Sequence, residues 1–296
     1  MLKKIGSWDL IELSVDLFNI SFILLLLLLT FSNPSAVPAW QAHALKILIV
    51  LLLYPVVAYG IKKISHELIH ISLHIVLVVG LYSFLFQAVA PLQHIIHPGW
   101  MDASMIAMET MVFGSELSLY LEQFTFPLLT EWMMFAYVIY VPLVPVIAFI
   151  CYFSEGKPAA ESYLLTLVLA YAVCFIGFVI YPVATPQFYM PEAYQISLKG
   201  WIFTWFGEWI RENQHNPGGG LPSPHTAAST VMLFFMYKYN RTIFYILLPV
   251  IITLYISTAY ARYHYISDAI LGIIAAFVVY GFTRRYVNRY TENYSG

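Results

Sequence analysis

Eight stretches of this 296-residue chain are apolar over roughly the length needed to cross a lipid bilayer. A membrane-spanning helix needs about 20 mostly apolar residues, because that length at 1.5 Å per residue matches the hydrocarbon core. By this criterion we predict helices at 15–32, 44–61, 69–91, 130–152, 160–181, 224–238, 242–260 and 265–283. The expected fold is therefore all-α, a polytopic membrane helix bundle with about eight transmembrane helices.

Composition supports this class and excludes others. Hydrophobic residues make up 60% of the chain and charged residues only 10%, whereas soluble domains carry about 25% charged residues. These values exclude a disordered chain, a nucleic-acid binder with a basic face and a secreted disulfide scaffold. Both cysteines, Cys151 and Cys174, fall inside apolar stretches, where we expect free, packed thiols.

Basic residues predict the orientation, because cytoplasmic loops retain Lys and Arg. Ten of the fourteen fall on one side of an eight-helix arrangement, which we take as cytoplasmic together with both termini: Lys3, Lys4, Lys62, Lys63, Lys157, Lys238, Arg241, Arg284, Arg285 and Arg289. The four exceptions on the outer side are Lys46, Lys199, Arg211 and Arg262. A bound anion on the outer face would explain why they are kept there.

Two long segments are expected on that outer side. Residues 92–129 hold no Lys or Arg but four acidic residues, and their apolar spacing predicts amphipathic helices on the membrane surface. Residues 182–223 contain Pro182, Pro186, Pro191 and Pro217, followed by the run Gly218-Gly219-Gly220, which predicts an irregular loop.

The segment Pro222-Ser223-Pro224-His225 predicts a helix start. Ser before Pro at the beginning of an apolar run is typical of an N-cap followed by proline at the first helical position. The free N–H groups of such a helix end can bind an anion. His225 would lie beside that anion site, in the first turn.

A second polar segment contains Arg262, His264 and Asp268. His264 and Asp268 are four residues apart, so on a helix they share a face and can form a hydrogen bond. A carboxylate bonded to one imidazole nitrogen fixes the tautomer and leaves the other nitrogen as a base or nucleophile. The guanidinium of Arg262 suits phosphate oxygens.

An even number of helices separates the two polar segments, so both are expected on the outer side. Two histidines, a carboxylate and an arginine beside a helix N-terminus form a metal-free set for phosphoryl transfer. In this set His264 is the expected nucleophile, Asp268 its orienting partner and His225 the general acid. Ser223 and Arg262 are the expected phosphate-binding residues.

At these residues the sequence resembles the type 2 phosphatidic acid phosphatase superfamily. Pro222-Ser223-Pro224-His225 matches the first of two family motifs except at its third position. Ser257, His264 and Asp268 match the second motif in full spacing, and Gly272 follows where a glycine is usual. The resemblance implies a six-helix catalytic core and a phosphohistidine intermediate, and it covers roughly residues 100–283.

The finer resemblance is to the inositolphosphotransferase branch, the inositol phosphorylceramide synthase-like proteins. Thr258 stands where the common motif has Arg, and the segment 181–186 and the Phe113-Gly114 pair also resemble that branch. Two features depart from the family pattern. Pro224 lacks an N–H that would face phosphate. The family's further motif, which contains a Lys and an Arg-Pro, has no recognisable match in this sequence. Lys199 or Arg211 is a candidate substitute as a phosphate-binding residue.

Two alternatives remain. His66-Glu67-Leu68-Ile69-His70 matches the zinc-protease pattern, with His74 continuing the stripe, so an intramembrane zinc metalloprotease is the rival enzyme. Eight spans also suit a transporter, which would need an ionisable pathway across the bilayer midplane.

We interpret the chain as an integral membrane lipid phosphatase or phosphotransferase without metal or cofactor. Its expected partners are a membrane lipid phosphate and an acceptor lipid or polyol, with no nucleic acid, and its active site is expected on the extracytoplasmic face. The expected organisation is N-terminal transmembrane helices over 1–99, a catalytic core over 100–283 and a short cytoplasmic tail over 284–296.

Overall fold

The computed structural model describes residues 7–213 and 217–294, and within these ranges all regular structure is helical. In this described part of the chain, six helices are long and apolar enough to cross a membrane: α1 (Ser7–Ser32), α2 (Trp40–Lys62), α3 (Glu67–Val89), α8 (Lys157–Ile180), α12 (Arg241–Tyr260) and α13 (Ile266–Tyr294). The all-α membrane bundle expected from the sequence is confirmed.

A seventh span forms from two helices. α6 (Pro127–Val138) and α7 (Tyr140–Glu155) are bent by 45° at their break, and together they are long and apolar enough to cross a membrane. The sequence predicted one helix over 130–152. Pro142 and Pro145 lack the N–H that a helix interior uses, and they weaken the backbone ladder just after the break at Ile139.

The helix expected at 224–238 is α11 (Pro224–Tyr239), whose 16 residues are fewer than the about 20 that a membrane-spanning helix needs. Ser223 caps its start and Asn240 follows its end, so the polar residues at both ends set its length. It packs against α8, α12 and α13 inside the bundle.

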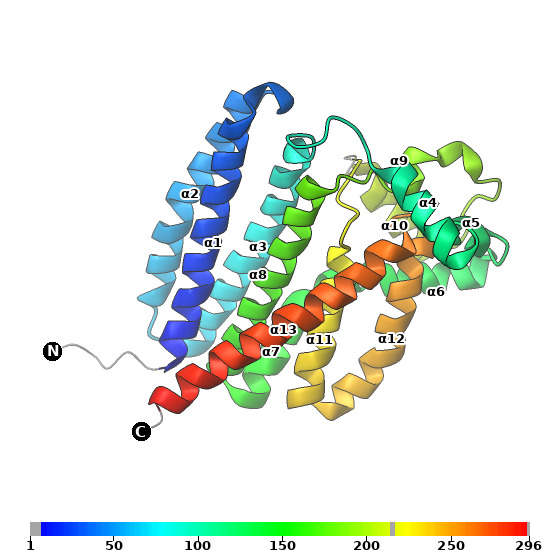
Figure 1. Cartoon of the computed structure of the whole chain (residues 1–296). Helices are drawn as coiled ribbons and strands as arrows, with labels where there is room; N and C mark the ends of the chain where they lie inside the picture. The colour runs from blue at the N-terminus through cyan, green and yellow to red at the C-terminus, as the bar shows by residue number, and fades with distance from the viewer. Residues whose placement is uncertain (1–6, 214–216, 295–296) are drawn as a thin grey trace.

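α8 is the central helix of the molecule. Most of its side chains are buried, and it contacts α1, α3, α7, α11 and α13. Figure 1 shows α1, α2, α3 and α8 standing side by side, while α13 crosses the bundle diagonally. The start of α1 and the end of α13 lie at the same end of the bundle, where the Ser14 and Tyr286 hydroxyl oxygens are 2.8 Å apart.

Shorter helices gather at the opposite end. α4 (Asp102–Phe113) and α5 (Leu117–Glu122) confirm the helices expected within 92–129, and α9 (Pro186–Tyr189) and α10 (Ile202–Asn213) lie near them (Figure 1). α10 is a correction, because 182–223 was expected to be irregular throughout. Its residues lie between the proline-rich and glycine-rich parts of the loop, and its side chains Ile202, Trp205 and Trp209 are exposed.

Candidate functional site

The first site residues sit at the start of α11. The Ser223 hydroxyl accepts a hydrogen bond from the Thr226 N–H, and Pro224 occupies the first helical position, so the predicted cap is confirmed. A Cβ at Gly272 would lie 2.4 Å from the Ser223 carbonyl oxygen. Glycine at 272 therefore lets α13 pack directly against this helix start.

His264 lies between the two polar segments. Its Nδ1–H donates to the Gly220 carbonyl oxygen at 3.1 Å, and the same nitrogen lies 3.3 Å from Asp268 Oδ2. A carbonyl can only accept, so the proton is on Nδ1 and Nε2 keeps its lone pair. Nε2 faces Ser223 Oγ at 3.3 Å and His225 Nδ1 at 3.4 Å.

The structure thus brings together four of the residues singled out in the sequence: Ser223, His225, His264 and Asp268. One detail differs from the expectation of a shared helix face. His264 precedes α13, which begins at Ile266, and the loop bends so that Asp268 in the first turn still reaches the imidazole. The Asp268 carboxylate also accepts from the Tyr265 N–H at 3.0 Å, which holds this bend.

Burial controls the ionisation of His264. The side chain is 3% exposed, and desolvation lowers the pKa of the imidazole to about 4, against the smaller opposite effect of the Gly220 carbonyl. The ring is therefore neutral at pH 7, as an attacking nitrogen must be.

Tyrosines from the α6–α7 break enclose His225. The Tyr137 ring stacks on the His225 imidazole at a centroid distance of 4.6 Å, and the Tyr140 ring lies 4.8 Å away. Tyr263 packs against Tyr137 at 4.6 Å. Sequence reasoning missed Tyr137 and Tyr140, because only the bend places them beside a residue more than 80 positions later.

Two carboxylates of α4 hold the loops that carry the site. Asp102 accepts from the Ala184 and Thr185 N–H groups and from the Tyr265 hydroxyl, at 2.7, 3.1 and 2.9 Å. Glu109 accepts from the Ser267 N–H at 2.8 Å, beside Asp268. Both carboxylates are fully buried, and desolvation raises the pKa of each.

The sequence predicts Asp102 and Glu109 only as acidic residues of a helix on the membrane surface, without a role in the site. The signal that could have identified them is the accumulation of acidic residues in a segment without Lys or Arg. Glu109 Oε2 and Asp268 Oδ1 are both buried and have no hydrogen-bond partner among the residues that the structure describes. Within the described part of the chain, the Asp268 carboxylate therefore keeps one unpaired oxygen while its other oxygen lies against the His264 ring.

Arg262 lies beside the site in a fixed position. Its guanidinium pairs with Glu122 at 3.2 Å, donates to the Ile196 carbonyl and lies 4.0 Å from the centre of the Tyr194 ring. Its backbone φ of +68° is in the left-handed region, so the chain turns sharply here before His264. In this arrangement Arg262 joins α5 to the 182–223 loop.

The remaining predicted phosphate-binding residues lie in that same loop. Lys199 is exposed just before α10. Arg211 belongs to α10, but its side chain lies outside the described residues.

The histidines of the zinc-protease pattern have separate partners at the other end of the bundle. His66 is the N-cap of α3, and its ring accepts from the Ile69 N–H. His70 pairs with Glu12 at 3.1 Å and His74 with Glu161 at 2.9 Å. Among the described residues no group of three or more His, Cys, Asp or Glu side chains could hold a metal ion.

Both histidine segments lie in a range of the chain that matches a known family. Residues 103–282 match the family model described as the PAP2 superfamily. No curated protein and no solved structure matches the chain. The matched range begins in α4 and ends in α13, so it contains Ser223, His225, His264, Asp268 and Glu109, and it starts one residue after Asp102.

Proposed function

The chain belongs to the PAP2 superfamily, the type 2 phosphatidic acid phosphatases, and we propose that it is a lipid phosphatase or phosphotransferase that forms a phosphohistidine at His264. Superfamily membership and the apolar helices support a membrane enzyme of the phosphatase type. The observation that carries the proposal is the arrangement of His264, with Nδ1 held by Gly220 and Asp268 and Nε2 facing His225.

The reaction divides into two transfers. In the first, the lone pair on His264 Nε2 attacks phosphorus, and the bond from phosphorus to the leaving oxygen breaks. Burial lowers the pKa of His225 to about 3, so the proposed route has His225 take up a proton when the phosphate anion binds beside it and then give that proton to the leaving oxygen. Asp268 stabilises the positive charge that develops on the His264 ring, as a carboxylate does beside a catalytic imidazole.

In the second transfer an oxygen nucleophile attacks the phosphohistidine. His225, now neutral, takes the proton of the attacking water or alcohol, the P–N bond breaks, and His264 is regenerated. Water gives a phosphatase, whereas the hydroxyl of a second lipid or a polyol gives a transferase. Thr258 and the 181–186 segment favour a transferase of the inositolphosphotransferase type.

The phosphate needs positive or polar groups around it. We assign this role to the Ser223 hydroxyl and the N–H groups at the start of α11, with Arg262, Lys199 and Arg211 as the candidate basic residues. Arg262 pairs with the Glu122 carboxylate in this structure. To bind phosphate, its guanidinium would leave the carboxylate and pair with a phosphate oxygen instead.

A labelling experiment tests the intermediate. The purified protein is mixed with a lipid phosphate carrying ³²P and quenched in alkali, where phosphohistidine survives. We expect label in the wild type and in His94→Asn, a control histidine in the loop after α3, but none in His264→Asn. Label of equal intensity in His264→Asn would overturn the proposal.

Two further readouts separate the alternatives. Product analysis with and without an acceptor polyol distinguishes hydrolysis from transfer. Because the proposed route uses only protein side chains, turnover should persist in EDTA, and a loss restored by zinc would favour a metalloenzyme instead.

A further inference from the structure

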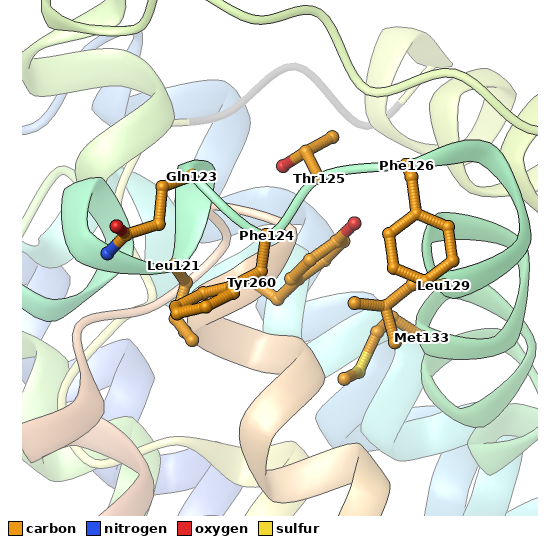
Figure 2. Close-up of a pocket in the computed structure, with 8 residues that line it drawn as sticks. All are labelled: Leu121, Gln123, Phe124, Thr125, Phe126, Leu129, Met133 and Tyr260. Carbon is orange, nitrogen blue, oxygen red and sulfur yellow. The ribbon is translucent and has the colours of Figure 1, made fainter.

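An apolar groove of about 500 Å³ opens where α5, α6 and the end of α12 meet. Figure 2 shows its lining, in which the apolar and aromatic residues are Leu121, Phe124, Phe126, Leu129, Met133 and Tyr260. We propose that this groove binds the hydrocarbon chain of the lipid whose phosphate reacts at His264. The inference rests on the proposed function and adds to it the residues that select the lipid chain.

One face of α6 connects the groove to the catalytic histidine. Leu129, Met133 and Tyr137 are spaced at four-residue intervals, so they lie in a row along the same side of the helix. The first two line the groove, and Tyr137 stacks on the His225 ring. Leu129 and Tyr137 are eight positions apart, which corresponds to about 12 Å at the rise of an α-helix. A chain lying along this row would place its head near His225.

The second wall of the groove leads to the same site. Tyr260 is the last residue of α12, and the turn that follows it carries Arg262 and His264. The Tyr260 hydroxyl oxygen lies 2.8 Å from Thr130 Oγ1, so α12 and α6 are tied together beside the groove. Both walls therefore converge on the residues that would act on the phosphate.

The polarity of the groove favours a lipid chain with its polar end toward the loop. None of its eight lining residues is charged. Glu122, which pairs with Arg262, follows directly after Leu121 at the edge of the groove. The Thr125 hydroxyl oxygen is buried and has no partner in the described part of the chain, and the ester oxygen of a lipid would give it one.

The location also favours a membrane occupant. Phe126, Leu128 and Trp132 beside the groove are large apolar side chains that are 45–67% exposed. Such a patch on a membrane protein faces lipid. The groove is therefore open to the compartment from which a lipid substrate enters.

Filling the groove should reduce activity only on lipids with long chains. We expect Leu129→Trp to lower kcat/KM for a C16 lipid phosphate at least about tenfold, the scale on which lost apolar contacts act in enzyme pockets. Activity on a short-chain C4 phosphate should stay within about twofold. The matched control is Leu128→Trp, the adjacent exposed residue outside the groove, which should leave both activities unchanged. An equal loss on both substrates, or a loss on neither, would overturn the groove assignment.

A photo-crosslinking experiment tests the groove without relying on turnover. A lipid phosphate with a diazirine near the end of its chain is bound to His264→Asn, and labelled peptides are mapped. We expect label within residues 121–133, competed by the C16 lipid phosphate and not by the C4 compound. Absence of label there would overturn the groove assignment, whatever the activity. Label there together with full activity of His264→Asn would leave the groove standing and overturn the phosphohistidine.

Discussion

At the scale of one residue, Asp268 separates the role of the orienting carboxylate from that of the nucleophilic imidazole of His264. Its carboxylate is 0% exposed, lies against His264 Nδ1 and accepts from the Tyr265 N–H. Asp268→Asn removes the charge that stabilises the imidazolium but leaves the nucleophilic Nε2 in place. We expect kcat to fall by about 10²–10⁴-fold, as for loss of an orienting group in comparable catalytic sets.

Steady-state kinetics on the purified variant, with circular dichroism to check helix content, measures this effect. His264→Asn is the reference because it removes the nucleophile itself. If Asp268→Asn retained wild-type kcat, the carboxylate would have no role in the chemistry.

The protonation of His264 predicts how stability changes with pH. Burial holds the pKa of His264 at about 4 in the folded protein, whereas an unfolded histidine has a pKa near 6.5. Between these values the unfolded chain binds more protons, so stability falls as pH decreases through this window.

Replacing His264 removes that contribution. We therefore expect the melting temperature of the wild type to drop more than that of His264→Asn between pH 7 and pH 5, measured in one detergent and buffer series. Parallel curves for the two proteins would show that His264 is not held neutral by burial.

At the scale of elements, α4 links the two loops that carry the catalytic residues. Glu109 is the partner of the Ser267 N–H at the start of α13. Glu109→Ala leaves this buried donor without a partner, which costs about 1–3 kcal/mol of stability. Glu109→Gln keeps an acceptor oxygen and should lose less. Thermal unfolding of both variants measures the difference, and equal melting temperatures would contradict the role assigned to α4.

The two ends of α12 provide a matched pair of arginines. Arg262 follows its C-terminal end and pairs with Glu122, whereas Arg241 begins the helix and lies 3.3 Å from the centre of the Tyr237 ring. We expect Arg262→Ala to lower kcat/KM at least about tenfold, because a charge-assisted contact to phosphate is lost. Arg241→Ala should have little effect. Equal losses in the two variants would assign Arg262 a purely structural role.

Elements defined by local sequence signals could be predicted, and those defined by tertiary contacts could not. The Ser223 cap and the His264–Asp268 pair follow from short spacings, so both were visible in the sequence. The stacking of Tyr137 on His225 depends on the bend between α6 and α7, and the bond from Ser267 to Glu109 joins residues 158 positions apart. No local pattern specifies such contacts. α10 could not be predicted in this way, because the prolines before it and the glycines after it are typical of an irregular loop.

At the scale of the whole molecule, two polar regions lie at opposite ends of the bundle. One is the candidate site. The other joins α1 to α8 through the ion pair of Glu12 with Lys157 at 2.5 Å, and α1 to α2 through the ion pair of Asp16 with Lys62 at 2.8 Å. Buried ionisable groups in a membrane bundle are stable only when paired. His70 and His74 of the zinc-protease pattern belong to this second region, and their pairing with Glu12 and Glu161 accounts for these histidines in the bundle.

The separation of the two ends predicts the side on which the enzyme acts. Lys62, Lys157 and Arg241 lie at helix ends opposite the site, whereas Lys199 and Arg262 lie at the site end. Since cytoplasmic loops retain basic residues, the end of the bundle with more basic residues is expected inside and the site outside.

Cys151 and Cys174 are buried, so a membrane-impermeant thiol reagent will report on introduced cysteines. In sealed right-side-out vesicles we expect Lys199→Cys to react and Arg241→Cys to stay protected until the membrane is opened. A soluble short-chain lipid phosphate should be hydrolysed by the same vesicles without entering them. The reverse labelling pattern would place the site in the cytoplasm, where the lipid phosphates it meets would come from the inner leaflet.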